Sequence, residues 1–343
     1  MEKISTIGLD LAKHVFQVHG VDAEGGVVLR KQLRRSAVMT FFARLAPCTV
    51  GIEACGSAHY WAREIAALGH RVKLMPPAYV KAYVKRGKND AADAEAICEA
   101  VMRPTMRFVP VKSAEQQANG MIYKVRELLV RQRTQLVNAL RGHLSELGVV
   151  STQGVGRLAD LIAAVRDRDD RRLPPAARWA LEELAAQIDV LNARIEQLDK
   201  EIVSQVRASE VGRRLTSIPG IGPITAGAML AMVPDASGFR SARHFATWLG
   251  LAPRLNATGG KQRLGRISKK GNRYLRGLLI LCAANVLRFS RKDRLPPWLT
   301  ALRERRPFKV AAVALAHKMA RIVWALMVKG GTYRAALPAS AGN

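Results

Sequence analysis

Cysteine and long apolar runs are both scarce in this chain of 343 residues. Its four cysteines form no C-x-x-C pair and have no histidine at metal-ligand spacing, which argues against a zinc site and predicts reduced, buried thiols. They are Cys48, Cys55, Cys98 and Cys282. No uninterrupted apolar run reaches the ~18 residues of a membrane span. The longest candidate, 310–328, contains three basic side chains, so we expect no membrane segment.

Acidic residues are too few to balance the basic ones. Lys and Arg number 55 and Asp and Glu number 27, which gives a net charge of +28 and a sequence pI near 10.9. Such a surplus repels itself unless a polyanion neutralises it, and nucleic acid is therefore the leading partner class. The first residues, MEKISTIGLD, lack the basic-then-apolar order of a signal peptide, and we expect a cytoplasmic protein.

Charge and hydrophobic pattern divide the chain into three segments. Residues 1–113 hold 17 basic and 10 acidic residues (+7), residues 114–211 hold 14 and 14 (0), and residues 212–343 hold 24 and 3 (+21). We predict domain borders at these positions. The fold class is α/β plus α: an α/β domain, a helical coiled-coil linker, and a basic, mainly helical domain.

The first segment alternates strand-like and helix-like stretches in the order of a ribonuclease H fold. In that fold the first and fourth strands lie side by side. Asp10 and Glu53 each follow the end of one of these strands, so we expect them to meet. The predicted strands are 6–9, 15–21, 27–33, 49–52 and 71–75, and the predicted helices are 36–45, 57–68, 77–85 and 89–102.

In the middle segment, apolar residues follow an a/d heptad seam from Leu181 to Ile202. A longer and less regular stripe runs from Met121 to Leu147. These helices are expected to pair as a hairpin or to dimerise, and the seam predicts a homo-oligomer of at least two protomers. A plain helical bundle within one chain is the alternative, because a/d stripes also line monomeric bundles.

Two further acids stand at the start of the predicted helix 89–102. Asp90 and Asp93 are three residues apart and share one face of that helix. If this face packs toward the sheet, four carboxylates meet, which is unfavourable unless divalent cations hold them. Oxygen ligands suit Mg²⁺, and two such ions can support phosphoryl transfer. Taken singly, Asp90 is equally well explained as a helix-start residue and Glu53 as a surface acid.

Three motifs resemble those of a known enzyme family. They are Ile7-Gly8-Leu9-Asp10-Leu11-Ala12-Lys13, Gly51-Ile52-Glu53-Ala54-Cys55-Gly56 and Lys88-Asn89-Asp90-Ala91-Ala92-Asp93-Ala94. They are similar to the acidic motifs of the DEDD transposases of the insertion-sequence one-hundred-ten type, and the resemblance extends over nearly the whole chain. It implies a RuvC-like (ribonuclease H) catalytic domain with Asp10, Glu53, Asp90 and Asp93 as metal ligands.

The basic segment contains a turn and a cationic run. Residues 217–226 (SIPGIGPITA) are typical of a helix-hairpin-helix turn, in which Gly220 and Gly222 let the backbone approach a phosphate. A glycine turn between packed helices is the alternative. Seven basic residues follow, with no acidic residue among them. They predict a loop that contacts the phosphates of a nucleic-acid backbone, although a solvated basic face has the same composition. They are Lys261, Arg263, Arg266, Lys269, Lys270, Arg273 and Arg276.

The resemblance also implies a hydroxyl nucleophile, at a position where members of the family carry a serine before a Gly-Gly or Gly-x pair. The matching residue here is Thr258, whose hydroxyl can attack but whose methyl crowds the attack. Ser268 is the only nearby serine. Attack by Thr258, attack by Ser268 and the absence of a covalent step are the three possibilities.

Together these features predict a transposase that cuts and rejoins the DNA of an insertion sequence. By resemblance, Mg²⁺ at the carboxylates activates the scissile phosphate, the C-terminal hydroxyl attacks it, and a structured RNA pairs with target and donor DNA. One rival is a RuvC-like endonuclease that uses metal ions and water alone. A second is a non-catalytic nucleic-acid-binding protein, against which the presence of all four acids speaks.

Overall fold

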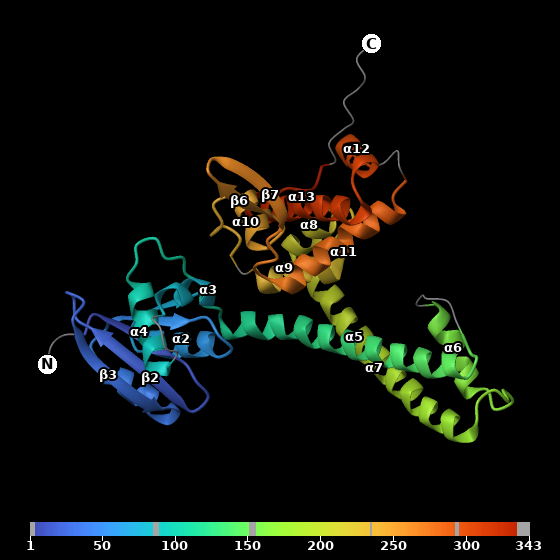
Figure 1. Cartoon of the computed structure of the whole chain (residues 1–343), viewed down its shortest axis with the longest axis horizontal. Coiled ribbons are helices and arrows are strands. Elements are labelled where there is room, and N and C mark those ends of the chain that lie inside the picture. The colour runs from blue at the N-terminus through green and yellow to red at the C-terminus, as the bar shows by residue number, and fades with distance from the viewer. Residues whose placement is uncertain (1–3, 85–88, 151–155, 234, 292–294, 335–343) are drawn as a thin grey trace, which may run out of the picture. The chain divides into compact units, whose positions relative to one another are not determined.

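A computed structural model describes residues 4–84, 89–150, 156–233, 235–291 and 295–334 (Figure 1). The chain packs into two compact units, residues 1–117 and 118–343. The first unit is a mixed α/β domain and the second is mainly helical, as the predicted class requires. The border predicted at residue 211 lies inside the second unit and marks a change of charge along it.

All five predicted strands are present, each within one residue of its expected ends. The predicted helix 77–85 is a short α-helix followed by a 3-10 turn, and its last residue lies outside the described residues. The elements of the first unit are β1 (Thr6–Asp10), β2 (Val15–Val21), β3 (Val27–Arg34), η1 (Arg35–Ala37), α1 (Val38–Ala43), β4 (Thr49–Glu53), α2 (Ala58–Ala67), β5 (Arg71–Met75), α3 (Pro77–Val80), η2 (Lys81–Tyr83) and α4 (Asp90–Val101).

The five strands form one sheet in the order β3-β2-β1-β4-β5. The pairs β1–β2 and β2–β3 are antiparallel, whereas β1–β4 and β4–β5 are parallel. The expected contact between the first and fourth strands is therefore observed, with Leu9 opposite Ile52. Asp10 and Glu53 are the next residues on these two strands.

Successive side chains along each strand point to opposite faces of the sheet, and the two faces pack against different helices. Ile7, Leu9 and Ile52 face a core that includes Phe42 of α1 and Trp61 of α2. The residues between them, among them Gly8 and Gly51, face α4 instead. Because Asp10 and Glu53 follow these glycines by two residues, both acids lie on the α4 face.

The elements of the second unit are α5 (Ala114–Glu146), which begins within the first unit, α6 (Gly156–Arg166), α7 (Pro175–Ala208), α8 (Glu210–Thr216), α9 (Pro223–Met232), α10 (Ala242–Trp248), β6 (Pro253–Thr258), β7 (Lys261–Ile267), α11 (Arg273–Phe289), α12 (Pro297–Arg305) and α13 (Phe308–Lys329). The strands β6 and β7 form a separate two-stranded antiparallel sheet.

The helices α5 and α7 pair within the chain as an antiparallel hairpin (Figure 1). Arg126 on α5 forms an ion pair with Asp199 on α7, with Nη2 3.0 Å from Oδ2. Arg133 donates to the Asn192 side chain over 3.1 Å. Residues Leu181, Ile188, Ile195 and Ile202 of the predicted seam are buried in this single chain. The other row of the seam, Leu184, Leu191 and Leu198, is half-buried. One row of the seam is therefore occupied intramolecularly, and this burial gives no evidence for a dimer.

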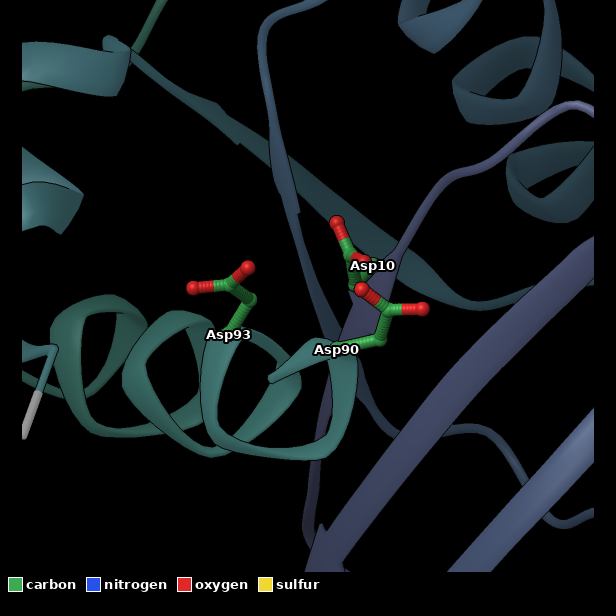
Figure 2. A group of neighbouring side chains, drawn as sticks. All are labelled: Asp10, Asp90 and Asp93. Carbon is green, nitrogen blue, oxygen red and sulfur yellow. The ribbon is translucent and has the colours of Figure 1, made fainter. Parts of the chain in front are cut away.

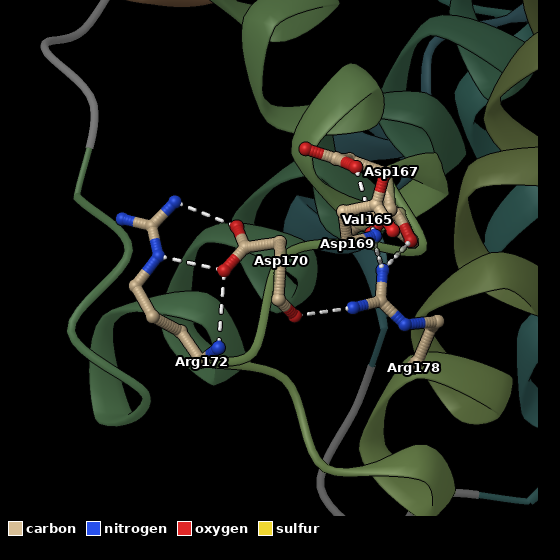
Figure 3. A network of polar contacts seen from close by, with 6 residues as sticks. All are labelled: Val165, Asp167, Asp169, Asp170, Arg172 and Arg178. Carbon is tan, nitrogen blue, oxygen red and sulfur yellow. Dashed lines mark hydrogen bonds and ion pairs between the residues drawn. The ribbon is translucent and has the colours of Figure 1, made fainter.

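The connection between α6 and α7 is held by Arg178 (Figure 3). Its guanidinium donates to the carbonyl oxygens of Val165 over 2.8 Å and Asp170 over 2.6 Å, and also to that of Asp167. Asp170 in turn pairs with Arg172 over 2.6 Å. One arginine on α7 thus satisfies three carbonyls that no helix or strand would pair, and it fixes the end of the hairpin.

Within the described ranges, α13 is the one helix long and apolar enough to cross a membrane, although the sequence contains no uninterrupted run of that length. Its buried residues, including Ala316, Ala320 and Val323, belong to the largest core cluster of the second unit. Packing of this kind is that of a core helix.

The four cysteines are free. Cys48, Cys98 and Cys282 are buried as expected, whereas Cys55 is exposed, which corrects the prediction for that residue. Burial raises the pKa of Cys48 to about 11 and that of Cys98 to about 12, so these thiols stay protonated and unreactive near neutral pH.

Candidate active site

Three of the four predicted acids converge at one end of the sheet. Each of Asp10, Asp90 and Asp93 offers a carboxylate oxygen, and these oxygens lie within 4.8 Å of one another. Figure 2 shows Asp90 and Asp93 on the first turn of α4, beside Asp10 at the end of β1. Three carboxylates at this separation form a set of oxygen ligands that fits a divalent cation.

Glu53 lies at the end of the neighbouring strand but outside this group of three. Burial and then the charge of Asp93 raise its pKa, which shows that Glu53 and Asp93 interact electrostatically. We call these four residues the acidic cluster; Asp10, Asp90 and Asp93 are its closely spaced part, and the sharing of one metal site by all four stays a prediction.

The electrostatics of Asp10 show how unfavourable this cluster is by itself. Burial, followed by the charges of Asp93, Asp90 and Glu53, raises the pKa of Asp10 from 3.8 to about 6, against a lowering hydrogen bond from the Leu11 backbone. Burial and each of the three neighbouring charges disfavour the ionised carboxylate, whereas the Leu11 hydrogen bond favours it. A bound divalent cation would reverse that effect, and the residues present fit such an ion.

Two glycines allow α4 to approach the sheet closely enough to complete the cluster. A Cβ on Gly8 would lie 2.1 Å from the Ala94 carbonyl oxygen, and a Cβ on Gly51 would lie 2.8 Å from the Cβ of Val101. Gly8 and Gly51 are directly opposite each other in the β1–β4 ladder. Together they make a flat patch on which α4 rests.

The start of α4 is fixed by Asn89, whose side-chain oxygen accepts a hydrogen bond from the Ala92 amide over 2.7 Å. This cap determines where the helix begins and therefore that Asp90 and Asp93 fall in its first turn. Neither the glycines nor this cap were predicted from the sequence. A glycine two residues before each strand-end acid is the signal that could have identified the glycine patch.

Thr258 lies in the second unit, at the end of β6 and beside the tip of the β6–β7 hairpin. The two turn residues, Gly259 and Gly260, both have positive φ, 55° and 77°, as a tight two-residue hairpin turn requires. Thr258 pairs with Lys261 across the turn and is exposed. The predicted loop is thus a β-hairpin, and Gly-Gly between two strand-like runs is the signal that could have revealed it.

The hairpin has two chemically different faces. Cross-strand pairs share a face, so Thr258 with Lys261 and Asn256 with Arg263 project to one side. Leu255 with Leu264 and Ala257 with Gln262 project to the other side. Leu255 is 56% and Leu264 is 75% exposed. Thr258, the predicted nucleophile, therefore lies on the cationic face of the hairpin, and the opposite face is apolar.

Ser268 is placed differently from Thr258. Its hydroxyl oxygen is buried and has no hydrogen-bond partner in the described part of the chain. Its backbone amide donates to the Ala252 carbonyl over 2.9 Å, and its own carbonyl accepts from Arg254 over 3.2 Å. An attacking oxygen must reach its phosphate, and this one is covered.

The segment after the hairpin is a tightly packed loop. A Cβ on Gly250 would lie 2.1 Å from the Lys270 carbonyl oxygen, and a Cβ on Gly271 would lie 1.8 Å from that of Trp248. Lys269 has a positive φ of 54°. Lys269, Lys270 and Arg273 are exposed, as phosphate-binding residues must be.

Arg276 differs from the other predicted phosphate-binding residues because it is only 8% exposed. Its guanidinium donates to the Leu249 carbonyl over 3.0 Å and to the Lys270 carbonyl over 2.9 Å. It therefore ties the two sides of the loop together. This corrects the role predicted for Arg276, whereas Lys261, Arg263 and Arg266 are exposed on β7.

The predicted helix-hairpin-helix residues connect α8 to α9. Gly220 has a φ of +85°, and a Cβ there would lie 2.4 Å from a methyl of Val286 on α11. Position 220 therefore needs a glycine because helices pack closely there. This is the alternative to the phosphate-binding role. Gly222 is exposed, with open space around it, immediately before α9 begins at Pro223.

Comparison with known proteins gives two family matches and several relatives. Residues 212–296 match the family described as "Transposase IS116/IS110/IS902 family", and residues 7–148 match the DEDD transposase family of the IS110 type. The chain is 52% identical over 335 residues to a probable family 20 transposase of Pseudomonas aeruginosa, covering 96% of this chain and 99% of the relative.

Two further relatives extend this comparison. The transposase for insertion sequence element IS1328 of Yersinia enterocolitica is 37% identical over 335 residues, covering 97% of this chain and 99% of the relative. The pilin gene-inverting protein of Moraxella lacunata is 25% identical over 293 residues, covering 80% of this chain and 79% of the relative.

Proposed function

The chain belongs to the IS116/IS110/IS902 family of insertion-sequence transposases, and from this premise we propose that it cuts and rejoins DNA through a covalent Thr258–DNA intermediate. Mg²⁺ held by Asp10, Glu53, Asp90 and Asp93 is the cofactor of this proposal. The convergence of Asp10, Asp90 and Asp93 within 4.8 Å is the observation that carries it.

The first unit is proposed to be a RuvC-like domain. The strand order β3-β2-β1-β4-β5, with only β1–β4 and β4–β5 parallel, supports this assignment. So does the position of the acids, because Asp10 and Glu53 end the two central parallel strands and α4 brings two more. A sheet of this kind places functional residues at the ends of its parallel strands.

In this proposal the four acids hold metal ions and do not exchange protons. Mg²⁺, when bound, would stabilise negative charge on the oxygens of the reacting phosphate. Asp10, Asp90 and Asp93 would bind the ion directly, and Glu53 would complete the set from β4. The fixed start of α4 and the Gly8–Gly51 patch maintain this arrangement.

Thr258 is proposed as the nucleophile. Its hydroxyl oxygen forms a bond to phosphorus and loses its proton, while the bond from phosphorus to the 3′ oxygen breaks and that oxygen takes up a proton. The exposure of Thr258, its place beside the Gly259–Gly260 turn and the burial of the Ser268 hydroxyl oxygen support this assignment. Lys261 and Arg263 on the same face would bind the phosphates next to the attacked one.

The decisive experiment combines the two halves of the proposal. With the element's DNA, the RNA that copurifies with the protein and Mg²⁺, wild-type protein is expected to leave a phospho-DNA adduct that mass spectrometry maps to Thr258. Asp10→Ala, Glu53→Ala, Asp90→Ala and Asp93→Ala are each expected to abolish cleavage and to leave nucleic-acid binding nearly unchanged. Cleavage without any adduct would instead identify a metal-dependent endonuclease that uses water.

A structured RNA is the second nucleic acid of the proposal. The last 132 residues carry a charge of +21, which suits two polyanions at once. Phosphate contacts by Gly222, Lys269, Lys270 and Arg273 belong to the same proposal. Sequencing RNA that copurifies with the protein tests it: one dominant RNA encoded next to the gene is expected, and random cellular RNA would contradict it.

A homo-oligomer that acts in the cytoplasm completes the proposal. The buried α7 seam no longer supports the oligomer, so its basis is that two DNA ends must be held for rejoining. Sedimentation of the purified chain with DNA measures it directly, and a monomer under conditions of full activity would exclude it.

A further inference from the structure

The face of the sheet that carries Asp10 continues onto the outer strands β2 and β3. The register pairs Asp10 with Gln17 on β2, and Gln17 with Gln32 on β3. Because paired residues share a face, these three side chains lie on one side of the sheet. The same alternation places Arg30 and Arg34 of β3 on that side and Lys31 on the opposite side, with buried Leu33.

The helix α4 covers only the inner part of this face, where His19 is 5% exposed. Farther out, Arg30, Gln32 and Arg34 are exposed and Gln17 is half-buried. Within the described ranges neither arginine forms an ion pair. Arg30 and Arg34 are thus two exposed cations on the same side of the sheet as the acidic cluster, and residues 25–52 contain no acid. Beside the acidic cluster there is an open, positively charged surface.

We propose that this surface, the β3 track of Gln17, Arg30, Gln32 and Arg34, binds the backbone of the DNA strand that is cut at the Asp10 site. The inference rests on the proposed function, because it takes the acids as the place where the scissile phosphate lies. Gln32 is two strands from Asp10, or about 10 Å, from a strand spacing of about 4.8 Å. A few nucleotides of the cut strand span that distance.

The side chains of the β3 track suit a phosphate backbone. Arginine forks bind phosphate oxygens with two parallel hydrogen bonds, and the amides of Gln17 and Gln32 can donate single ones. Contacts of this kind carry no sequence information. The β3 track would therefore fix the direction in which the strand enters the acidic site, without selecting its sequence.

Charged residues on an edge strand also have a simpler use, since they prevent pairing with the edge of another sheet. That use does not depend on the face, and Lys31 fulfils it as well as its neighbours do. Lys31 instead lies 5.7 Å from the ring centre of Phe41 on the opposite side. A comparison of the two faces therefore separates edge protection from DNA binding.

The first test measures the salt dependence of binding by the full-length chain to a 40-nucleotide strand of oligo(dT) in EDTA. Arg30→Gln with Arg34→Gln is expected to lower the slope of log K against log salt by about 1.4, because each lost contact to a single strand accounts for about 0.7. The matched control, Lys31→Gln with Arg44→Gln, removes the same charge outside the β3 track, because Lys31 faces the opposite side of the sheet and Arg44 is the exposed residue that follows α1. Equal slopes for the two double variants would overturn the proposal.

The second test identifies the nucleic acid. A photo-crosslinking benzoylphenylalanine replaces Gln32 in cells that carry the insertion sequence, and Lys31 in the control. A DNase-sensitive adduct at position 32 only is expected. An RNase-sensitive adduct, or none, would overturn the assignment to DNA.

Failures of the two proposals are distinguishable. If Asp10→Ala abolishes cleavage while Arg30→Gln with Arg34→Gln binds as wild type does, the acidic site stands and the β3 track is refuted. If the slope falls as expected while Asp10→Ala still cuts, the β3 track stands as a DNA-binding surface and the catalytic role of the acids is refuted.

Discussion

At the scale of single residues, the proposed chemistry depends most on Asp10 and Thr258, and both are unusual in their surroundings. Asp10 is a carboxylate among other carboxylates, with a pKa raised to about 6. Thr258 is a β-branched residue at a position where a serine would leave the hydroxyl less crowded. Each can be changed without altering the shape of the chain.

Replacing Asp10 by Asn should stabilise the metal-free protein while abolishing DNA cleavage. Between pH 3.8 and about 6 the folded chain binds more protons at Asp10 than the unfolded chain does, so wild-type stability falls as pH rises through this window. Asp10→Asn removes this loss of stability with rising pH, because the amide does not ionise. Thermal unfolding in EDTA at pH 7.5 should show a higher midpoint for the variant and no further rise when Mg²⁺ is added.

The matched control is Glu99→Gln on α4, which removes a carboxylate from an exposed ion pair with Arg103, two residues beyond the end of that helix. Exposed pairs of this kind contribute at most about 1 kcal/mol, so the midpoint should change little. A lower midpoint for Asp10→Asn than for wild type in EDTA would contradict the repulsion described for the acidic cluster.

Two variants at Thr258 and one at Ser268 distinguish the possible nucleophiles. Thr258→Ser keeps the hydroxyl and removes the crowding methyl, so activity should be retained or should rise. Thr258→Val keeps the β-branched shape without a hydroxyl, and cleavage should be lost. Ser268→Ala should leave cleavage intact. Full activity of Thr258→Val, or an adduct on Ser268, is the result that would refute this role.

At the scale of secondary-structure elements, the position of α4 on the sheet determines whether the acids meet. Gly8→Ala would place a Cβ 2.1 Å from the Ala94 carbonyl oxygen, and backbone must shift to admit it. Overpacking of this kind costs about 1–3 kcal/mol. We expect that loss of stability together with a large loss of cleavage, because Asp90 and Asp93 move with the helix. Urea unfolding and a strand-cleavage assay measure both.

Gly56→Ala is the control for this experiment, since nothing lies within 4 Å of a Cβ at that position and Gly56 is exposed. It should unfold and cleave like wild type. If Gly8→Ala cleaves normally, close packing of α4 is not what assembles the acidic site.

Some features of these elements could be predicted from the sequence alone, and others could not. The strands of the first unit were predictable because alternation and bordering glycines are local signals, and the strand order predicted that Asp10 and Glu53 end neighbouring strands. The meeting of Asp10 with Asp90 and Asp93 also required α4 to pack its acidic face toward the sheet, which helix periodicity alone does not determine. The intramolecular use of the Leu181–Ile202 seam was not predictable, since an a/d pattern is the same whether its partner is α5 or a second chain. Arg276 was misassigned because its burial comes from Leu249 and Lys270, two carbonyls that no charge pattern reveals.

At the scale of the whole molecule, three quarters of the net positive charge, +21 of +28, lies in the last 132 residues, whereas the acidic site lies in the first 117. Binding and cleavage should therefore be separable. Charge reversal of the exposed Lys269, Lys270 and Arg273 is expected to lower affinity for DNA and RNA broadly and to flatten its salt dependence. Binding titrations at several salt concentrations provide the measurement.

Arg276→Gln is the internal comparison for that experiment. Because Arg276 is buried and ties Leu249 to Lys270, its loss should reduce the stability of the second unit as well as binding. A change in the preferred DNA sequence at constant salt slope, in the triple charge-reversal variant, would show that these cations read bases instead of phosphates.

The β6–β7 hairpin has a consequence for how engagement of the substrate can be observed. A two-stranded hairpin with both faces in solvent is only marginally stable by itself. Its amide hydrogens between Leu255 and Leu264 should therefore exchange with deuterium almost as fast as in an open chain when the protein is free, and slowly once a strand lies against Thr258. The exchange rates of these amides would therefore report when the substrate binds, without an attached probe and without catalytic turnover.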